Sequence, residues 1–350
     1  MEIEQDVELA PRTTLRVGGR ARYFARAESE NDISQALDFA TARNLQVFVL
    51  GGGSNVVVAD GGVDGLVLAI AMRGITIRDS KEHAVVSACA GEPWDELVSR
   101  SVELGLRGLE CLSGIPGLVG ATPIQNVGAY GQEIADTVVE VRAFDRVEKC
   151  FVTLTKRDCL FAYRDSRFKS HQKGRFVISA VDFRLDRGVP QGIRYPELRQ
   201  ALDRLGREPT LADVRETVIA LRRSKSMVVD RVDENSRSCG SFFVNPTVTE
   251  ALAEQIERRF APLPMPRYPQ EPGWVKLSAA WLIERAGLAK GTRAGNVGIS
   301  TRHALALVCH EGATATELLA FECFVRERVR ERTGVVLTPE PIFWGSTAAS

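Results

Sequence analysis

Two glycine-rich stretches, each set among apolar residues, constrain this chain more than any other feature. The first, Gly51-Gly52-Gly53-Ser54-Asn55, follows the apolar run Val47–Leu50 directly and leads at once into Val56-Val57-Val58. The second, Ser113–Gly131, is too apolar for a linker and too interrupted by Gly and Pro for a long helix. Because glycine permits close approach of the backbone, both loops can present N–H groups to phosphate oxygens. We expect a dinucleotide pyrophosphate as their ligand.

The two best-known phosphate-binding motifs are absent from the sequence. No Gly-x-Gly-x-x-Gly opens a helix and no Gly-x-x-x-x-Gly-Lys-Ser/Thr occurs, so neither a Rossmann fold nor a P-loop is indicated. In the alternative interpretation, the glycines only form tight turns. The presence of two such loops, both flanked by apolar strands, favours a ligand-binding role.

The periodicity of apolar residues predicts an α+β fold. A short polar arm precedes the first strand, strands dominate between Val138 and Leu185, and helix and loop follow from Leu211. Residues Arg222–Pro246 show little periodicity and are expected to form a boundary and a functional loop. The elements expected elsewhere are strands at Arg22–Ala27, Val47–Leu50, Val56–Val58, Leu66–Ile70, Ala84–Cys89 and Val335–Trp344, and helices at Asn31–Arg43, Glu92–Leu104, Ser278–Ala286 and Thr314–Thr333.

Length and charge restrict the class of protein. A chain of 350 residues predicts two or three domains. Forty-five basic residues balance forty-five acidic ones, so no net field would draw the molecule onto nucleic acid or an anionic membrane. The N-terminus lacks the pattern of a signal peptide, and no run approaches the roughly 18 apolar residues of a membrane span. We therefore expect a cytoplasmic protein.

Cysteine and histidine give no sign of a disulfide framework or a metal site. The seven cysteines form an odd set without a Cys-x-x-Cys pair, and the four histidines lack metal-ligand spacing. We expect reduced thiols and no metal. These residues are Cys89, Cys111, Cys150, Cys159, Cys239, Cys309 and Cys323, and His83, His171, His303 and His310.

A few polar residues stand where chemistry is conceivable. Ser241 follows Gly240, where a backbone can lie close to a substrate, although a plain turn before a buried strand explains the same pattern. Arg164 and Glu340 each adjoin a strand-like run and can equally be surface charges. Lys225 follows two arginines and can hold a phosphate, or can simply be a solvated helix end.

Seven segments taken together resemble the UDP-N-acetylenolpyruvoylglucosamine reductases, flavoenzymes of bacterial cell-wall synthesis. Each fragment is weak alone, but their order and spacing cover nearly the whole chain. They are Thr13–Gly19, Leu50–Val56, Ile115–Gly120, Pro123–Gly131, Tyr163-Arg-Asp-Ser166, Gly240-Ser-Phe-Phe243 and Pro339-Glu340.

The resemblance implies a fold and a domain arrangement. An FAD-binding fold of the vanillyl-alcohol oxidase type would occupy two subdomains, residues 1–74 and 75–216. A smaller α+β substrate-binding domain would span 217–319, and 320–350 would return to the FAD half.

The resemblance also implies site residues. Arg164, Ser241 and Glu340 match the catalytic arginine, the proton-donating serine and the catalytic glutamate. Tyr195 matches the substrate-clamping tyrosine of the longer type in this family, Lys225 and Asn245 match diphosphate contacts, and Lys276 is a candidate near the uridine. The expected FAD contacts are Gly51, Gly52, Gly53, Ser54, Asn55, Ser113, Gly114, Ile115, Pro116, Gly120, Ala121, Gln125, Asn126, Gly128 and Gly131.

The implied activity is reduction of UDP-N-acetylglucosamine enolpyruvate to UDP-N-acetylmuramate. FAD would be the bound cofactor and NADPH the co-substrate, in a monomer that serves peptidoglycan synthesis and hence cell shape and division. Two departures from the family pattern, at Ser226–Val232 and at Cys239, leave loop details open.

Two other functions remain open from the sequence. One is a flavin oxidase of the same fold that acts on a sugar alcohol or lactone. The other is a nucleotide-sugar binding module without redox chemistry, in which the glycine loops only hold phosphate.

Overall fold

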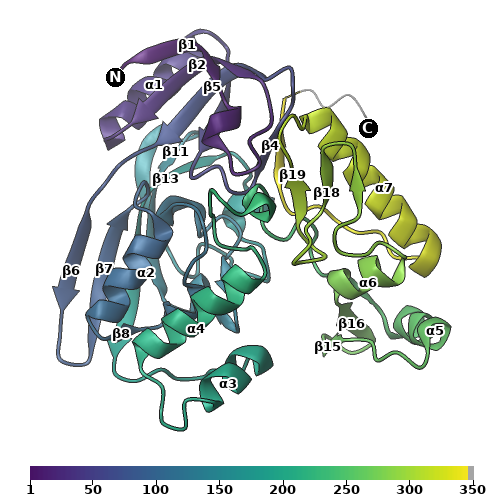
Figure 1. Ribbon diagram of the computed structural model, residues 1–350. Helices are drawn as coiled ribbons and strands as arrows, with labels where there is room; N and C mark the ends of the chain where they lie inside the picture. Colours follow the sequence, from purple (N-terminus) through teal and green to yellow (C-terminus); the bar gives the residue numbers. More distant parts are fainter. Residues whose placement is uncertain (346–350) are drawn as a thin grey trace. The chain divides into compact units, whose positions relative to one another are not determined.

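The first glycine-rich loop is where the chain passes from one structural unit to another. The structure, a computed structural model, describes residues 1–345 (Figure 1). Unit 1 comprises Met1–Val7, Ala21–Gly53 and Asp64–Val228. Unit 2 comprises Glu8–Arg20, Ser54–Val63 and the chain from Val229 onward. The division into 1–74, 75–216, 217–319 and 320–350 stays a prediction, and residues 346–350 of its last segment lie outside the described part.

Unit 1 contains a four-stranded sheet with one helix nearby. The strand order is β1-β2-β5-β3, and β3 runs parallel to β5. Helix α1 begins with a capping box, in which Ser29 accepts from the Asp32 N–H at 3.2 Å and Asp32 accepts from the Ser29 N–H at 2.9 Å. It buries Ile33, Ala36, Leu37 and Ala40, which the 3.6-residue period places on one face. The bounds are β1 Ile3–Glu8, β2 Arg20–Ala27, α1 Glu30–Ala42, β3 Gln46–Leu50 and β5 Val63–Ile70.

A second sheet of unit 1 is built on the long strand β13. The order is β12-β11-β13-β7-β6, with β8 also paired to β13, and the pairs are antiparallel. Helices α2 and α4 lie side by side (Figure 1). The bounds are β6 Ile75–Asp79, β7 His83–Cys89, α2 Trp94–Glu103, β8 Leu106–Arg107, β9 Gly128–Ala129, β10 Gln132–Glu133, β11 Val138–Asp145, β12 Cys150–Thr155, β13 Phe176–Arg187, α3 Pro196–Asp203 and α4 Leu211–Ser224.

Unit 2 has its own apolar core, to which helix α7 contributes a buried face. Asp60 accepts from the N–H groups of Ala315 and Thr316 at 2.7 and 2.9 Å, so a carboxylate lies at the helix N-terminus. Gly334 ends the helix with φ 75°, a left-handed conformation that glycine adopts without strain. The last strand, β20, runs parallel to β4.

Three small sheets complete unit 2. Their orders are β14-β16-β15, β17-β18-β19 and β20-β4. The bounds are β4 Val56–Val58, β14 Thr247–Thr249, α5 Glu250–Phe260, β15 Arg267–Pro269, β16 Trp274–Leu277, α6 Ala279–Arg285, β17 Arg293–Ala294, β18 Val297–Ile299, β19 Leu307–Cys309, α7 Ala315–Thr333 and β20 Ile342–Trp344.

Most expected elements are confirmed within a few residues, including the capping box of Thr314 and Glu317. The polar N-terminal arm was wrong, because it forms β1. The final strand is shorter than expected, because only the last three residues of the predicted range, Ile342–Trp344, form a strand. Helix α4 extends to Ser224 and so includes the first residues of the loop expected from Arg222. In residues 1–345, no helix is long and apolar enough to cross a membrane.

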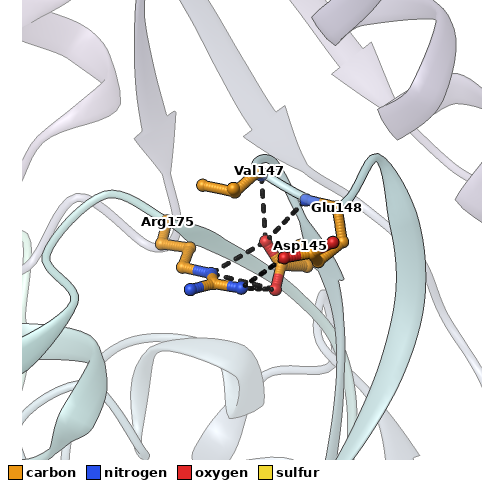
Figure 2. Close-up of polar contacts among 4 residues, drawn as sticks. All are labelled: Asp145, Val147, Glu148 and Arg175. Carbon is orange, nitrogen blue, oxygen red and sulfur yellow. Dashed lines mark hydrogen bonds and ion pairs between the residues drawn. The ribbon is translucent and has the colours of Figure 1, made fainter.

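A buried carboxylate closes the turn between β11 and β12, as Figure 2 shows. Asp145 accepts from the N–H groups of Val147 and Glu148 at 2.9 and 3.2 Å and from Arg175 Nη2 at 2.6 Å. The hydrogen bonds from Arg175 hold the pKa of Asp145 below its ordinary value. The ionised form is therefore the one that the fold requires.

We expect Asp145→Ala to lower the free energy of unfolding at pH 7 by about 2 kcal/mol, because charge-assisted hydrogen bonds and two turn amides lose their acceptor. A group whose folded pKa is depressed stabilises the protein above its unfolded pKa, about 3.9, and loses that contribution as pH falls through the folded value. The difference between wild type and variant should therefore shrink as pH falls below about 4. Urea titrations between pH 7 and pH 3 measure it, with exposed Asp38→Asn as the control. An undiminished difference at pH 3 would contradict the assigned role.

Candidate active site

The two glycine-rich loops meet inside unit 1. A Cβ atom on Gly52 would lie 2.7 Å from the Cα of Gly117, closer than real Cβ contacts come. A Cβ on Gly51 would lie 3.5 Å from the Cβ of Ala121, which is ordinary contact. The backbone of the first loop therefore touches the backbone of the second at Gly52, and only glycine fits there.

The second loop is fixed to the segment that leads into α2. The Trp94 N–H donates to the Gly117 carbonyl at 3.0 Å, and the Gly120 N–H donates to the Ala90 carbonyl at 2.9 Å. A Cβ on Gly120 would come within 2.5 Å of the Cβ of Ala90. The loop is thus held at two points and has no room for a side chain at the second.

Asp95 ties this loop to helix α4. Its carboxylate accepts from the Gly114 N–H at 2.6 Å and from both terminal nitrogens of Arg215, at 2.7 and 2.8 Å. Burial opposes ionisation, but the hydrogen bonds from Arg215 and Gly114 outweigh it and lower the pKa of Asp95. The Gly114 N–H is therefore engaged within the protein.

The backbone amides of the first glycine-rich loop differ from the Gly114 amide in their hydrogen bonding. Among residues 1–345, no loop or turn acceptor binds the N–H groups of Gly52 and Gly53. Unpaired amides in a glycine loop are suited to an anionic group. This loop therefore has the donor set that a pyrophosphate requires.

Arg164 lies in unit 1 with φ 53°, in the left-handed region. Its Nη2 donates to the Gly128 carbonyl at 2.5 Å, and its guanidinium lies 5.3 Å from the Tyr163 ring centroid. Lys169 Nζ donates to the Arg164 carbonyl at 2.7 Å. The Arg164 side chain thus binds the second glycine-rich loop, and the Arg164 backbone carbonyl binds Lys169.

Asn126 and Ser113, both expected at the FAD site, make protein contacts with their side chains. The buried Asn126 donates to Glu133 at 2.7 Å and to the Ala162 carbonyl at 3.0 Å. Ser113 Oγ donates to the Glu110 carbonyl at 2.7 Å. Both side chains therefore hold the loop in shape.

The expected substrate residues of unit 1 lie at one cluster. Tyr195 packs edge-on against Tyr130 of the second glycine-rich loop, with ring centroids 5.1 Å apart. Lys225, which follows α4, forms an ion pair with Glu197 in the first turn of α3.

Burial raises the pKa of Tyr130 to about 12, so its phenol stays protonated at neutral pH.

Three expected site residues come together in unit 2 from distant parts of the chain. The Glu340 N–H donates to the Phe242 carbonyl at 2.8 Å, which places the segment after Ser241 beside Glu340. Asn55 Nδ2 donates to the Glu340 carbonyl at 3.5 Å, and the Asn55 carbonyl accepts from the Ile342 N–H at 3.0 Å. Ser241, Glu340 and Asn55 therefore share one small region.

Lys276 and Asn245 both belong to unit 2, where Lys276 lies in the sheet β14-β16-β15 and Asn245 shortly precedes its strand β14. Lys276 stands opposite Tyr268 and Thr247 in the sheet β14-β16-β15. Asn245 precedes β14 by two residues and accepts from the Ala279 N–H at 2.9 Å. The alternation of strands puts Lys276, Tyr268 and Thr247 on one face of this sheet.

The expected residues divide between the two units. Unit 1 carries Arg164, Tyr195, Lys225 and most expected FAD contacts, and unit 2 carries the others. Those of unit 2 are Ser54, Asn55, Ser241, Asn245, Lys276 and Glu340.

Several neighbours of these residues were missed by sequence reasoning. Tyr130, Glu197 and Tyr268 contact or face expected site residues only because of the tertiary fold. Arg222 carried a local signal, since it lies three residues before Lys225 and so on the same side of the helix end.

Within residues 1–345, the buried thiols are unreactive and the potential metal ligands do not cluster. Burial raises the pKa of Cys111, Cys159 and Cys309 to about 12, so these thiols stay protonated at neutral pH. Among the described residues, no group of three or more His, Cys, Asp and Glu is placed to hold a metal ion.

Comparisons with known proteins agree with the two loops and the shared region of unit 2. Residues 21–152 match the family model of an FAD binding domain, and residues 231–344 match that of the C-terminal domain of UDP-N-acetylenolpyruvoylglucosamine reductase. Reductases of this name from Salinispora arenicola and Thermobifida fusca are each 45% identical to the chain. The matches cover 97% of this chain and 96% of the first relative, and 98% of both chains for the second.

A solved structure has the same fold. The crystal structure of the reductase from Thermus caldophilus superimposes with a TM-score of 0.68 at 26% identity, over 99% of this chain and 100% of that one. The predicted fold class is confirmed, α+β with an FAD-binding fold of the vanillyl-alcohol oxidase type. The chain belongs to the UDP-N-acetylenolpyruvoylglucosamine reductase family and is an FAD-dependent oxidoreductase.

Proposed function

We propose that this protein reduces UDP-N-acetylglucosamine enolpyruvate to UDP-N-acetylmuramate with electrons from NADPH. The observation that carries the proposal is the side-by-side placement of the Ser241 and Glu340 segments, in a chain that matches reductases of this name over nearly its full length. The protein would act in the cytoplasm, in the supply of peptidoglycan precursors.

The glycine loops fit FAD. At the contact of Gly52 with Gly117 a Cβ has no room, and the amides of Gly52 and Gly53 can bind pyrophosphate oxygens. The residues proposed to hold FAD are Gly51, Gly52, Gly53, Ser54, Asn55, Ser113, Gly114, Ile115, Pro116, Gly120, Ala121, Gln125, Asn126, Gly128 and Gly131. Because Gly114 N–H and the Asn126 and Ser113 side chains have protein partners, we assign these three a positioning role in the loop.

When bound, FAD would supply the hydride for this reduction, with NADPH as the source of the electrons. The hydride adds to the vinyl carbon distal to the ether, and the electron pair of the double bond moves onto the carboxylate-bearing carbon. The resulting enolate has to be stabilised until a proton reaches that carbon. The protein must therefore provide positive charge near the carboxylate and an acid near the carbon.

Arg164, Glu340 and Ser241 are proposed for these tasks. The Arg164 guanidinium stabilises the developing charge, and Glu340 orients the same region of the substrate. Ser241 delivers the proton from its hydroxyl oxygen. A serine hydroxyl is a weak acid, so this step depends on a strongly basic enolate held close to it.

Four residues are proposed to bind the nucleotide. Tyr195, Lys225 and Asn245 would contact the diphosphate, and Lys276 would lie near the uridine. Tyr268, directly opposite Lys276 in the sheet, is an additional aromatic surface for the base.

The two half-reactions test the function directly. Under anaerobic conditions NADPH is expected to bleach the visible absorption band of the flavin, and the enolpyruvyl nucleotide is then expected to restore it. A flavin that NADPH does not bleach would favour the oxidase, and a purified protein that takes up no FAD would favour the nucleotide-sugar binding module.

We expect Ser241→Ala to leave flavin reduction by NADPH intact and to slow flavin reoxidation by the enolpyruvyl nucleotide by about a hundredfold to ten-thousandfold, because only the second half-reaction needs the proton. Stopped-flow absorbance of the two steps measures both in one preparation. An equal loss in the two steps would contradict the role of proton donor.

We expect Gly52→Ala to weaken FAD binding by about ten- to a hundredfold, because relief of the clash with the Gly117 backbone separates the loops at a cost of about 1–3 kcal/mol. Fluorescence titration of the apoprotein with FAD measures the dissociation constant. Gly61→Ala is the matched control, since a Cβ there meets nothing within 4 Å. Unchanged affinity in Gly52→Ala would argue against FAD contact at this loop.

A further inference from the structure

Five side chains of unit 1 form a cluster around Tyr130. Tyr195 packs against its ring, Glu197 pairs with Lys225, and Arg222 and Glu197 both act electrostatically on the Tyr130 phenol. The cluster therefore combines two cations, one anion and two aromatic rings.

The positive charge of this cluster is incompletely matched inside the protein. Arg222 Nη2 donates to the Met227 carbonyl at 2.7 Å, but its Nε is buried and has no hydrogen-bond partner among the described residues. A buried donor without an acceptor is costly, and native proteins seldom leave one unless a ligand or water completes it. The carboxylate that acts on Arg222 is Asp95, which already pairs with Arg215.

We propose that Glu197 is an internal counter-ion that occupies Lys225 in the free protein and is displaced by the diphosphate of the nucleotide substrate. The inference rests on the proposed function, in which Lys225 contacts that diphosphate. It adds a residue that sets how tightly the nucleotide binds, because every binding event has to break the Lys225–Glu197 ion pair.

The ion pair is suited to such an exchange. The side chains of Lys225 and Glu197 are 28% and 41% exposed, so solvent screens their attraction and the pair is weak. A diphosphate carries more negative charge than one carboxylate and offers several acceptor oxygens. The substrate therefore competes favourably for the same lysine.

Glu197 also has a place to go after displacement. It lies in the first turn of α3, directly after Pro196 at the first helical position, and an acidic side chain there is stabilised by the N-terminal end of the helix. Tyr195 is the N-cap of the same helix. After release, the Glu197 carboxylate therefore keeps a favourable position at the N-terminus of the helix that follows Tyr195.

Removal of the counter-ion should tighten nucleotide binding. We expect Glu197→Gln to lower both KM for the enolpyruvyl nucleotide and the dissociation constant of UDP about two- to fivefold, the range of a partly exposed ion pair. UDP is titrated against the oxidised holoenzyme by difference absorbance of the flavin, which also shows that the variant is folded. Glu216→Gln removes the same charge from the exposed side of α4 and should change neither constant.

A double-mutant cycle separates competition from other effects. In a Lys225→Ala background, Glu197→Gln should no longer tighten UDP binding, because the competed cation is gone. Weaker binding in Glu197→Gln, or the same tightening without Lys225, would overturn the inference. UDP binding needs no redox step, so failure of NADPH to reduce the flavin would refute the proposed function while leaving this result readable.

Discussion

The close approach of two glycine-rich backbones is the constraint on which this structure depends. At Gly52 and Gly117 the chains touch so closely that even a methyl group has no room. The contact can form only because the second loop is hydrogen-bonded to the segment before α2 and because Asp95 joins it to α4 through Arg215. A flexible sequence element thus becomes a fixed surface of backbone amides, and the surrounding sheets supply the rigidity that glycine lacks.

Carboxylates in this protein have two structural roles that the sequence alone does not distinguish. Asp145 and Asp95 accept backbone N–H groups as well as arginine, so they hold turns and loops in place. Within residues 1–345, Glu197 pairs with one partly exposed lysine and accepts no backbone amide. Removal of the first kind costs stability because several donors lose their acceptor, whereas the second kind can exchange its partner for a ligand.

Sequence reasoning found the loops and elements that local spacing encodes. Capping residues defined α7, and apolar runs defined β3, β4 and β5. Strand β1 escaped because only Ile3 and Val7 are partly buried in it, so it lacks the alternation of a half-buried strand. The last strand was overextended because Val335 and Leu337 are buried without strand pairing and Pro339 cannot donate a ladder hydrogen bond.

The site was accessible to the sequence only through its resemblance to a family. Ser241 and Glu340 carry no shared local pattern, and their neighbourhood arises from long-range backbone pairing. For the same reason, the partners Tyr130 and Glu197 were not anticipated, because pairs of side chains from different elements leave no periodic signal.

In unit 2, backbone atoms and not the side chains of Ser241 and Glu340 align the two segments. The hydrogen bonds that join the two segments run between backbone atoms, from Glu340 to Phe242 and from Val244 to Thr338. Phe242 and Phe243 are fully buried and anchor this segment in the core of unit 2. This pairing uses backbone atoms and neither the serine hydroxyl nor the glutamate carboxylate, so a substitution of either side chain leaves in place the hydrogen bonds that align the two segments.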